Sequence, residues 1–236
     1  MIKVENIDMW GFEHAIRGMR NPLNSWNKSD SIKCYANRDC PGICNNNKCG
    51  LCIGSNDLAL MKRLYKAGTE HRKYLRQIFV SMDITAPLYW WKEMDTYWVG
   101  KTQNSCSTMH KIAAKEFELD DFSHEHLSKP ACSVLNTIIS ELNRQRDAYN
   151  KANAVKYPKL YSDGSTSVTY SKKHAWWQMI QLLPSSYNQR RTITMNYENI
   201  VSIIKQRTGH KLDEWNEFVK ILKTLPYITE ICGGRE

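Results

Sequence analysis

The stretch from Asp57 to Trp98 restricts the fold most, because its pattern changes from helix to strand and back to helix. Between Asp57 and Gly68 apolar residues recur at helical spacing, and these two residues suit the N-terminal and C-terminal caps. Residues 74–85 (YLRQIFVSMDIT) combine β-branched and aromatic side chains, which is typical of a strand. Pro87 suits the first turn of a following helix. This order predicts a fold that contains both helices and strands.

The rest of the chain adds more helix than strand. The first 26 residues predict a short strand followed by a helix, and residues 131–152 have a strongly amphipathic helical pattern. We expect another helix over 174–183, before Pro184, and two more within 190–226, separated near Gly209. Residues 95–111, 112–130 and 157–173 are expected to be connections. Together these elements predict one helix-rich α+β domain over residues 1–236, with a mixed or antiparallel sheet.

Composition narrows the class of protein and of partner. The chain has 236 residues, of which 42% are hydrophobic and 24% charged, as in ordinary globular proteins. No apolar run approaches the roughly 18 residues of a membrane span, and the N-terminus lacks the apolar region of a signal peptide. We therefore expect a soluble, cytoplasmic protein with no membrane partner. The net charge of +9 favours an anionic partner such as a nucleotide, although a solvated basic surface explains it equally well.

Residues 27–54 form a polar insertion that is rich in cysteine. Cys49 and Cys52 have the spacing of a zinc knuckle, and Cys40 and Cys44 can supply the other two thiolates of a tetrahedral site. The segment has little apolar content, so a bound metal would supply folding energy that burial cannot. We predict structural zinc at these four cysteines, and the alternative is a loop with free thiols.

Residues 95–111 (DTYWVGKTQNSCSTMHK) mix aromatic, hydroxyl, amide and cationic side chains that packing alone does not require. A predicted strand and helix lead into Asp95-Thr96-Tyr97, and Ser105 follows after seven intervening residues. The segment GTEHRKYL, which contains His71, lies just before that strand. The hydroxyls, lysines and backbone amides of such a segment can donate to an anion.

A second group of residues lies farther along the chain. Leu183-Pro184 precedes Tyr187, and Asn196 is followed by Ile200 and, eleven residues after Asn196, by Arg207. In order and spacing, the two groups resemble the flavin-dependent thymidylate synthase family. The resemblance covers roughly residues 57–111 and 176–227.

The resemblance implies a thymidylate-synthase-like fold and a set of ligands. In the family, flavin adenine dinucleotide (FAD) lies at the subunit interfaces of a homotetramer, and a methylene group passes from a folate to deoxyuridylate (dUMP). Three signature positions differ here: the Arg-His-Arg triplet is Asp95-Thr96-Tyr97, a phosphate-binding arginine is Ser107, and the arginine of an Asn-x-Arg pattern is Glu198. Cationic contacts are therefore missing from their usual places, and we expect Glu198 to face solvent.

Other residues are candidates to hold the nucleotide or cofactor, by matching the family pattern or by replacing its cations. They are His71, Lys101, Ser105, Ser107, His110, Lys111, Arg190, Asn196 and Arg207. Each has a structural alternative, such as turn formation for the serines and interaction with the last carbonyls of a helix for Arg207. We predict no catalytic residue, because the family's chemistry needs no protein nucleophile.

Three functions are consistent with these patterns. The first is a diverged enzyme of this type, which binds a pyrimidine nucleotide similar to dUMP, with FAD and folate, and transfers a one-carbon unit to the pyrimidine. The second is a nucleotide-binding or sequestering protein without turnover, of viral or mobile-element origin. The third is a zinc-knuckle module that binds nucleic acid, which we rank last because the basic residues are spread along the chain.

Overall fold

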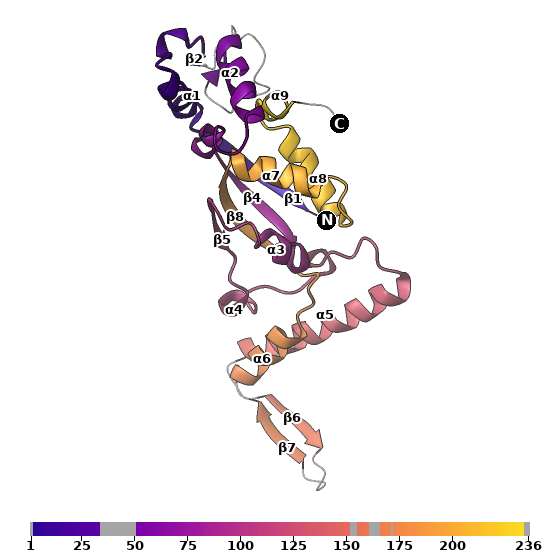
Figure 1. The fold of residues 1–236 in the computed structure, drawn as a ribbon. Helices are drawn as coiled ribbons and strands as arrows, with labels where there is room; N and C mark the ends of the chain where they lie inside the picture. The colour runs from indigo at the N-terminus through magenta and orange to yellow at the C-terminus, as the bar shows by residue number, and fades with distance from the viewer. Residues whose placement is uncertain (1, 34–50, 152–154, 161–165, 171, 234–236) are drawn as a thin grey trace. The chain divides into compact units, whose positions relative to one another are not determined.

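The computed structural model describes residues 2–33, 51–151, 155–160, 166–170 and 172–233, and Figure 1 shows its helices and strands. The chain divides into two compact units. The larger consists of Ile2–Thr85, Lys92–Asn104 and Arg191–Glu236, and the smaller contains Ala86–Trp91 and Ser105–Arg190. The helix-rich α+β class is confirmed, whereas a single domain over residues 1–236 stays a prediction.

A four-stranded sheet belongs almost entirely to the larger unit. Its order is β1 (Lys3–Trp10), β4 (Phe79–Pro87), β8 (Asn188–Asn196) and β5 (Lys101–Ser105). Strands β1 and β4 are antiparallel, with Lys3 opposite Thr85 and Trp10 opposite Phe79. Strands β1 and β5 therefore form the two edges of this sheet.

Alternating side chains explain why β4 and β8 lie in the middle of the sheet. Val80, Met82 and Ile84 of β4 are fully buried, as are Ile193 and Met195 of β8. Successive residues of a strand point to opposite faces, so these five side chains line one face of the sheet. That face supplies a large part of the apolar surface that stabilises the larger unit.

Five helices accompany the sheet in the larger unit. They are α1 (Phe12–Arg20), α2 (Ser55–Lys66), α7 (Tyr197–Arg207), α8 (Asp213–Lys223) and α9 (Ile228–Cys232). Short 3-10 helices cover Asn21–Leu23 (η1), Trp26–Lys28 (η2) and Lys73–Gln77 (η3). The ring of Phe12 meets the ring of Tyr197 edge-on at 5.4 Å, and both side chains are buried. Helix α1 is thereby packed against α7.

A buried ion pair joins α1 to α2. Arg20 Nε donates to Asp57 Oδ1 at 2.6 Å, and neither side chain is more than 4% exposed. Asp57 therefore does not cap α2 as predicted. The first-turn amides of α2 are satisfied instead by Asp30, whose carboxylate accepts from the backbone N–H groups of Asn56 and Asp57 at 2.8 and 3.1 Å.

The smaller unit is built around two packed helices, α5 (Lys129–Asn150) and α6 (Lys172–Leu182). Its other elements are α4 (Thr108–Lys111), the 3-10 helix η4 (Leu119–Asp121), and the strands β6 (Val155–Leu160) and β7 (Thr166–Tyr170). Leu135, Ile139 and Leu142 of α5 pack with Met179 of α6 in a buried apolar cluster. The last helix, α3 (Leu88–Met94), directly follows β4.

Three segments differ from the sequence prediction. Residues 157–173 were expected to be a connection, but β6 and β7 pair there in antiparallel fashion; their valine, threonine and tyrosine content favours strands. Residues 190–196 belong to strand β8, before the first of the two expected helices. The expected connection at 95–111 contains both β5 and α4.

The cysteine-rich insertion lies largely outside the described residues, including Cys40, Cys44 and Cys49 of the predicted zinc site. At its borders, β2 (Ile32–Lys33) pairs with β3 (Leu51–Cys52). Within the described residues, no group of three or more histidine, cysteine or carboxylate side chains could hold a metal ion. No helix in this part of the chain is long and apolar enough to cross a membrane.

Candidate functional site

Arg207 lies at the C-terminal end of α7, at the centre of a polar cluster in the larger unit. Its Nη1 donates to Glu93 Oε2 at 2.6 Å, and its Nε donates to the hydroxyl of Tyr97 at 2.9 Å. Nη1 also lies 3.0 Å from Nε2 of His210. The predicted approach of Arg207 to the beginning of the segment 95–111 is therefore present, through Tyr97.

Aromatic rings surround the same guanidinium. It lies 4.6 Å from the ring centroid of Trp215 and 5.6 Å from that of Tyr97. The indole N–H of Trp215 donates to Glu93 Oε2 at 2.9 Å, so one carboxylate oxygen aligns both the ring and the cation. Among the described residues, no group accepts from Nη2 of Arg207. This side chain is thus fixed in place and retains an unused pair of charged N–H donors.

A second cluster forms around Asp95, the residue that begins the segment 95–111. Asp95 Oδ1 accepts from Nε2 of Gln103 and from Nη1 of Arg191, both at 2.8 Å. Lys101 lies farther away, with its Nζ 3.7 Å from the same oxygen, and donates instead to the carbonyl of Met94 at 2.8 Å. Strands β5 and β8 thereby place two cations beside one carboxylate.

The charged groups in this cluster shift one another's pKa values. Burial raises the pKa of the Asp95 carboxyl, but the hydrogen bond from Gln103 and the charge of Arg191 outweigh burial and hold that pKa below its usual value. Burial lowers the pKa of the Lys101 ammonium, and the charge of Arg191 adds to this effect, while Asp95 opposes it. Asp95 is therefore ionised at neutral pH and neutralises Arg191 within the fold.

Asn196 has a structural role that explains its presence. It is the N-cap of α7, where its side chain accepts from the N–H of Asn199 at 3.0 Å, and the Asn199 side chain accepts in return from the Asn196 N–H. Asn199 Nδ2 also donates to the carbonyl of Val99 at 2.6 Å. Gly100, whose φ is +74°, permits this approach, because a Cβ there would lie 2.5 Å from Asn196 Nδ2. The reciprocal cap therefore also positions the turn before β5.

Glu198 does not face solvent, contrary to the expectation. Its Oε1 accepts from Nε and Nη2 of Arg72 at 3.0 and 2.8 Å, and its side chain is only 15% exposed. Arg72 in turn lies over the ring of Tyr65, 5.4 Å from the centroid. An arginine from a different part of the chain thus neutralises the carboxylate at this position.

His71 lines a cavity of about 370 Å³ in the larger unit. Its neighbours in the wall include Glu70, Lys73 and Tyr74 from the chain around η3, and Met19 from α1. The backbone N–H of His71 donates to the carbonyl of Gly68 at 3.1 Å. Of the predicted binding residues, His71 is the one placed in the wall of this cavity.

The remaining predicted residues belong to the smaller unit. Ser107 is the N-cap of α4 and accepts from the N–H of His110 at 3.1 Å, so its hydroxyl proton stays available. Lys111 ends the same short helix, and Ser105 ends β5. The carbonyl of Arg190 accepts from the N–H of Cys106 at 2.9 Å, which places β8 beside this segment. These five residues therefore gather around one stretch of backbone, whereas His71, Lys101, Asn196 and Arg207 belong to the larger unit.

Sequence reasoning missed the residues that hold Arg207. Glu93 and Trp215 were assigned no role, and Asp95 and Tyr97 were noted only because they replace family residues. A usable signal was the cationic end of α7, because an arginine there needs an acidic or aromatic partner when it is mostly buried. The partner Glu93 could not be found without knowing how α3 and α8 pack.

Comparison with known proteins supports the fold. No protein-family model matches the chain, and no curated protein matches it. A solved structure of thymidylate synthase X (ThyX) from Helicobacter pylori with FAD and dUMP is similar, with a TM-score of 0.57 and 15% identity over 98% of this chain and 95% of that one. So is a UMP/dUMP methylase, PolB, from Streptomyces cacaoi bound with 5-Br UMP, with a TM-score of 0.60 and 13% identity over 98% and 93% of the chains. The chain has the ThyX-like fold that its sequence predicts.

Proposed function

We propose that this protein binds a pyrimidine nucleotide, with Arg207 directed at the ring. The observation that carries the proposal is the guanidinium itself, which lies against the rings of Tyr97 and Trp215 with Nη2 unused by the described residues. The carbonyl oxygens of uracil are acceptors, and an aligned guanidinium is a strong charged donor to them. The ThyX-like fold adds support, since the two similar proteins are named for dUMP and UMP.

The smaller unit by itself carries donors suited to a phosphate. The hydroxyl oxygen of Ser107 accepts one hydrogen bond in the cap of α4, and its proton can be donated to a phosphate oxygen. Lys111 and His110 lie in the same short helix, and Ser105 and Arg190 come from adjacent strand ends. Hydroxyls and a lysine recognise phosphate as separate donors, whereas arginine can bind two phosphate oxygens at once, so affinity need not match that of an arginine-based site.

At two of the three signature sites that differ from the family, this chain has a carboxylate where the family has arginine. The carboxylate of Asp95 already binds Arg191, and that of Glu198 already binds Arg72. Neither position therefore offers net positive charge to an anionic cofactor such as FAD. We therefore propose nucleotide binding without the family's flavin contacts, and we derive no reaction step through the flavin.

These ion pairs favour a nucleotide-binding protein without turnover over the one-carbon transfer that the sequence also suggested. The enzymatic alternative needs both FAD and a folate. An absorption spectrum of the purified protein, and a methyl-transfer assay with dUMP, folate and added FAD, separate the two. A flavin spectrum together with product formation would contradict the non-catalytic version. Zinc at Cys40, Cys44, Cys49 and Cys52, and assembly as a tetramer, stay predictions.

Calorimetric titration with UMP and dUMP tests the binding site. Arg207→Gln should weaken binding roughly 10- to 100-fold, the usual loss for a hydrogen bond to a charged group. Lys205→Gln is the matched control, because Lys205 is an exposed cation in the same helical turn. Arg207→Lys keeps the charge but loses the planar donor, so its nucleotide affinity should lie between those of the parent protein and Arg207→Gln. Unchanged affinity in a folded Arg207→Gln protein would refute the assignment.

A further inference from the structure

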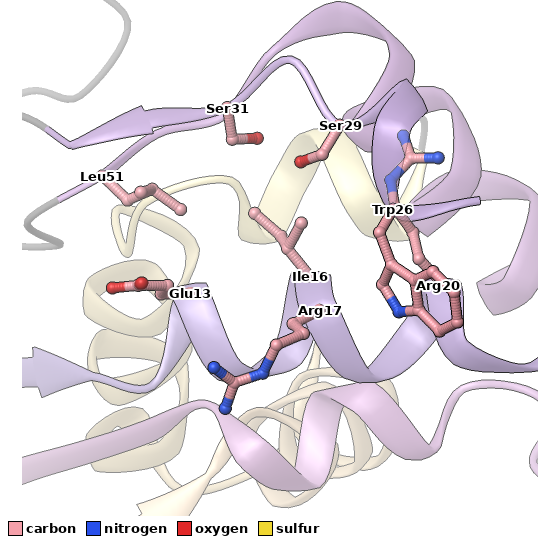
Figure 2. Close-up of a pocket in the computed structure, with 8 residues that line it drawn as sticks. All are labelled: Glu13, Ile16, Arg17, Arg20, Trp26, Ser29, Ser31 and Leu51. Atoms are coloured by element: carbon pink, nitrogen blue, oxygen red, sulfur yellow. The ribbon is translucent and has the colours of Figure 1, made fainter. Parts of the chain in front are cut away.

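A separate pocket of about 260 Å³ lies near the N-terminus, in the larger unit. Figure 2 shows Ile16 of α1 and Leu51 of β3 pointing into it, with Ser29 and Ser31 along one side and Trp26 along another. None of these residues belongs to the site around Arg207. The pocket therefore combines an apolar floor with a polar wall, which is the usual character of a small-molecule site.

The two serines of this wall can act only as acceptors. The hydroxyl of Ser29 donates its proton to Asp57 Oδ2 at 2.7 Å, and that of Ser31 donates to the same oxygen at 2.6 Å. A hydroxyl has one proton and two lone pairs. The Ser31 hydroxyl accepts from the N–H of Gly54 at 3.1 Å, which uses one of its lone pairs. Among the described residues, no donor uses either lone pair of the Ser29 hydroxyl. Figure 2 shows both oxygens turned toward each other at the pocket.

Asp57 keeps the serines in this state. It is completely buried and, besides the two hydroxyls, accepts from Arg20 and from the backbone N–H groups of Asp30 and Ser31. Burial raises the pKa of its carboxyl, but the hydrogen bonds from Ser31, Ser29 and Arg20 outweigh burial and leave that pKa below its usual value. An ionised Asp57 is an acceptor only, so the serine protons point to it and not to the pocket.

Trp26 presents a flat ring beside the serines. Its indole N–H is engaged, because it donates to Asn21 Oδ1 at 2.7 Å. Nevertheless 52% of the residue is exposed, which is unusual for a side chain of this size. A fixed and exposed indole next to a pocket is suited to stack a planar ring.

The charges at the mouth are not all satisfied within the fold. Arg20 is bound by Asp57, and Glu13 lies 3.6 Å from Lys33. Arg17 is exposed, its Nη2 lies 3.1 Å from Nδ1 of His14, and no carboxylate of the described residues forms an ion pair with it. The pocket therefore carries net positive charge from Arg17, where an anionic group of a ligand would be favoured.

We propose that this pocket binds a second nucleotide, one whose base carries an exocyclic amine, such as a cytosine or adenine nucleotide. The amine offers two N–H donors to the acceptor oxygens of Ser29 and Ser31, the base stacks on Trp26, and the phosphate meets Arg17. A uracil base presents carbonyl oxygens on both sides of its N3–H, and these would repel the serine oxygens. The pocket and the Arg207 site thus select opposite hydrogen-bonding patterns.

The test is a calorimetric titration of the full chain with CMP, AMP and UMP. Wild-type protein should bind CMP or AMP at least ten-fold more tightly at this pocket than UMP. Trp26→Leu and Ser29→Ala should each weaken that binding roughly ten-fold, given the usual contribution of base stacking and of a hydrogen bond. Trp10→Leu is the control, because Trp10 is also an exposed tryptophan of the larger unit but stacks on Phe79.

Arg207→Gln separates this proposal from the proposed function. It should weaken UMP binding and leave CMP and AMP binding unchanged, while Trp26→Leu should do the reverse. Equal binding of all three nucleotides to a folded Arg207→Gln protein, in which the first site is weakened, would overturn the proposal. So would unchanged CMP and AMP affinity in a folded Trp26→Leu protein.

Discussion

Asp57 and Asp95 are both carboxylates that an arginine from another element binds, yet their surroundings differ. Asp57 is completely buried, and its partner Arg20 is 4% exposed. The side chain of Asp95 is 33% exposed, and its partner Arg191 is 11% exposed. The charges of the Arg20–Asp57 pair have no access to water and depend on each other. In the Arg191–Asp95 pair, water can take over much of the hydrogen bonding if one partner is lost. Although their hydrogen bonds are similar, the Arg20–Asp57 pair should therefore contribute much more to the free energy of unfolding than the Arg191–Asp95 pair.

The comparison is tested most severely by Asp57→Ala. This change leaves Arg20 buried without its carboxylate, so the free energy of unfolding should fall by about 3–5 kcal/mol. Urea denaturation of the variant and the parent measures the difference. Glu217→Ala serves as a control, since it removes only the exposed pair with Lys220 and should cost less than about 1 kcal/mol. A similar small loss for both variants would show that burial does not decide the outcome.

Gly100→Ala asks whether backbone packing, not the carboxylate, anchors the segment after Asp95. The new Cβ would lie 2.5 Å from Asn196 Nδ2 at a φ of +74°, and we expect a loss of about 2–3 kcal/mol in the free energy of unfolding. Gly209→Ala is closely matched, because its φ is +73° but nothing lies within 4 Å. It should lose roughly 1–2 kcal/mol from backbone strain alone. Equal losses in thermal or chemical denaturation would exclude a contribution from the Asn196 contact.

Asp95→Asn should have a smaller effect. The amide retains an acceptor for Gln103 but loses the charge that Arg191 and Lys101 face, so we expect a loss of about 0.5–1.5 kcal/mol. A double-mutant cycle with Arg191→Gln, followed by urea denaturation, isolates the pair. A loss as large as that of Asp57→Ala would remove the distinction between the two carboxylates.

The smallest expected difference between Asp57 and Asp95 is in how stability depends on acidic pH. Both carboxyls have a folded pKa below the usual value of 3.8. Stability from each is therefore present above that value and is lost as pH falls below it, through the folded pKa. We expect the fall in the free energy of unfolding below about pH 4 to be less steep in Asp57→Asn than in the parent. Asp95→Asn should change that slope less, and denaturation midpoints measured at several acidic pH values would show the order.

Local sequence signals predicted most of the helices, because caps and apolar spacing act within a few residues. The segment ending at Gly68 and the helices on either side of Gly209 are examples. Strand β8 was missed, although Ile193 and Met195 alternate with threonines, because the strand runs directly into α7. Its partners β4 and β5 are distant in sequence, and such pairing has no local signature.

The candidate site was predictable only in outline. The approach of Arg207 to Tyr97 follows from the family spacing and is present. The pairing of Glu198 with Arg72 was not foreseeable, because the two residues are 126 positions apart and only the packed fold brings them together. The pocket beside Trp26 was likewise not foreseen, because the direction of the serine protons depends on the buried position of Asp57.

The short ladder between β2 and β3 brings Ile32 opposite Cys52 and Lys33 opposite Leu51. The described residues on either side of positions 34–50 therefore lie next to each other. The entropy needed to close a loop rises only slowly with its length, by about 0.6 kcal/mol for each doubling. Extra residues, or an entire reporter domain, inserted between Lys33 and Leu51 should thus be tolerated, which makes this the preferred place to attach a label.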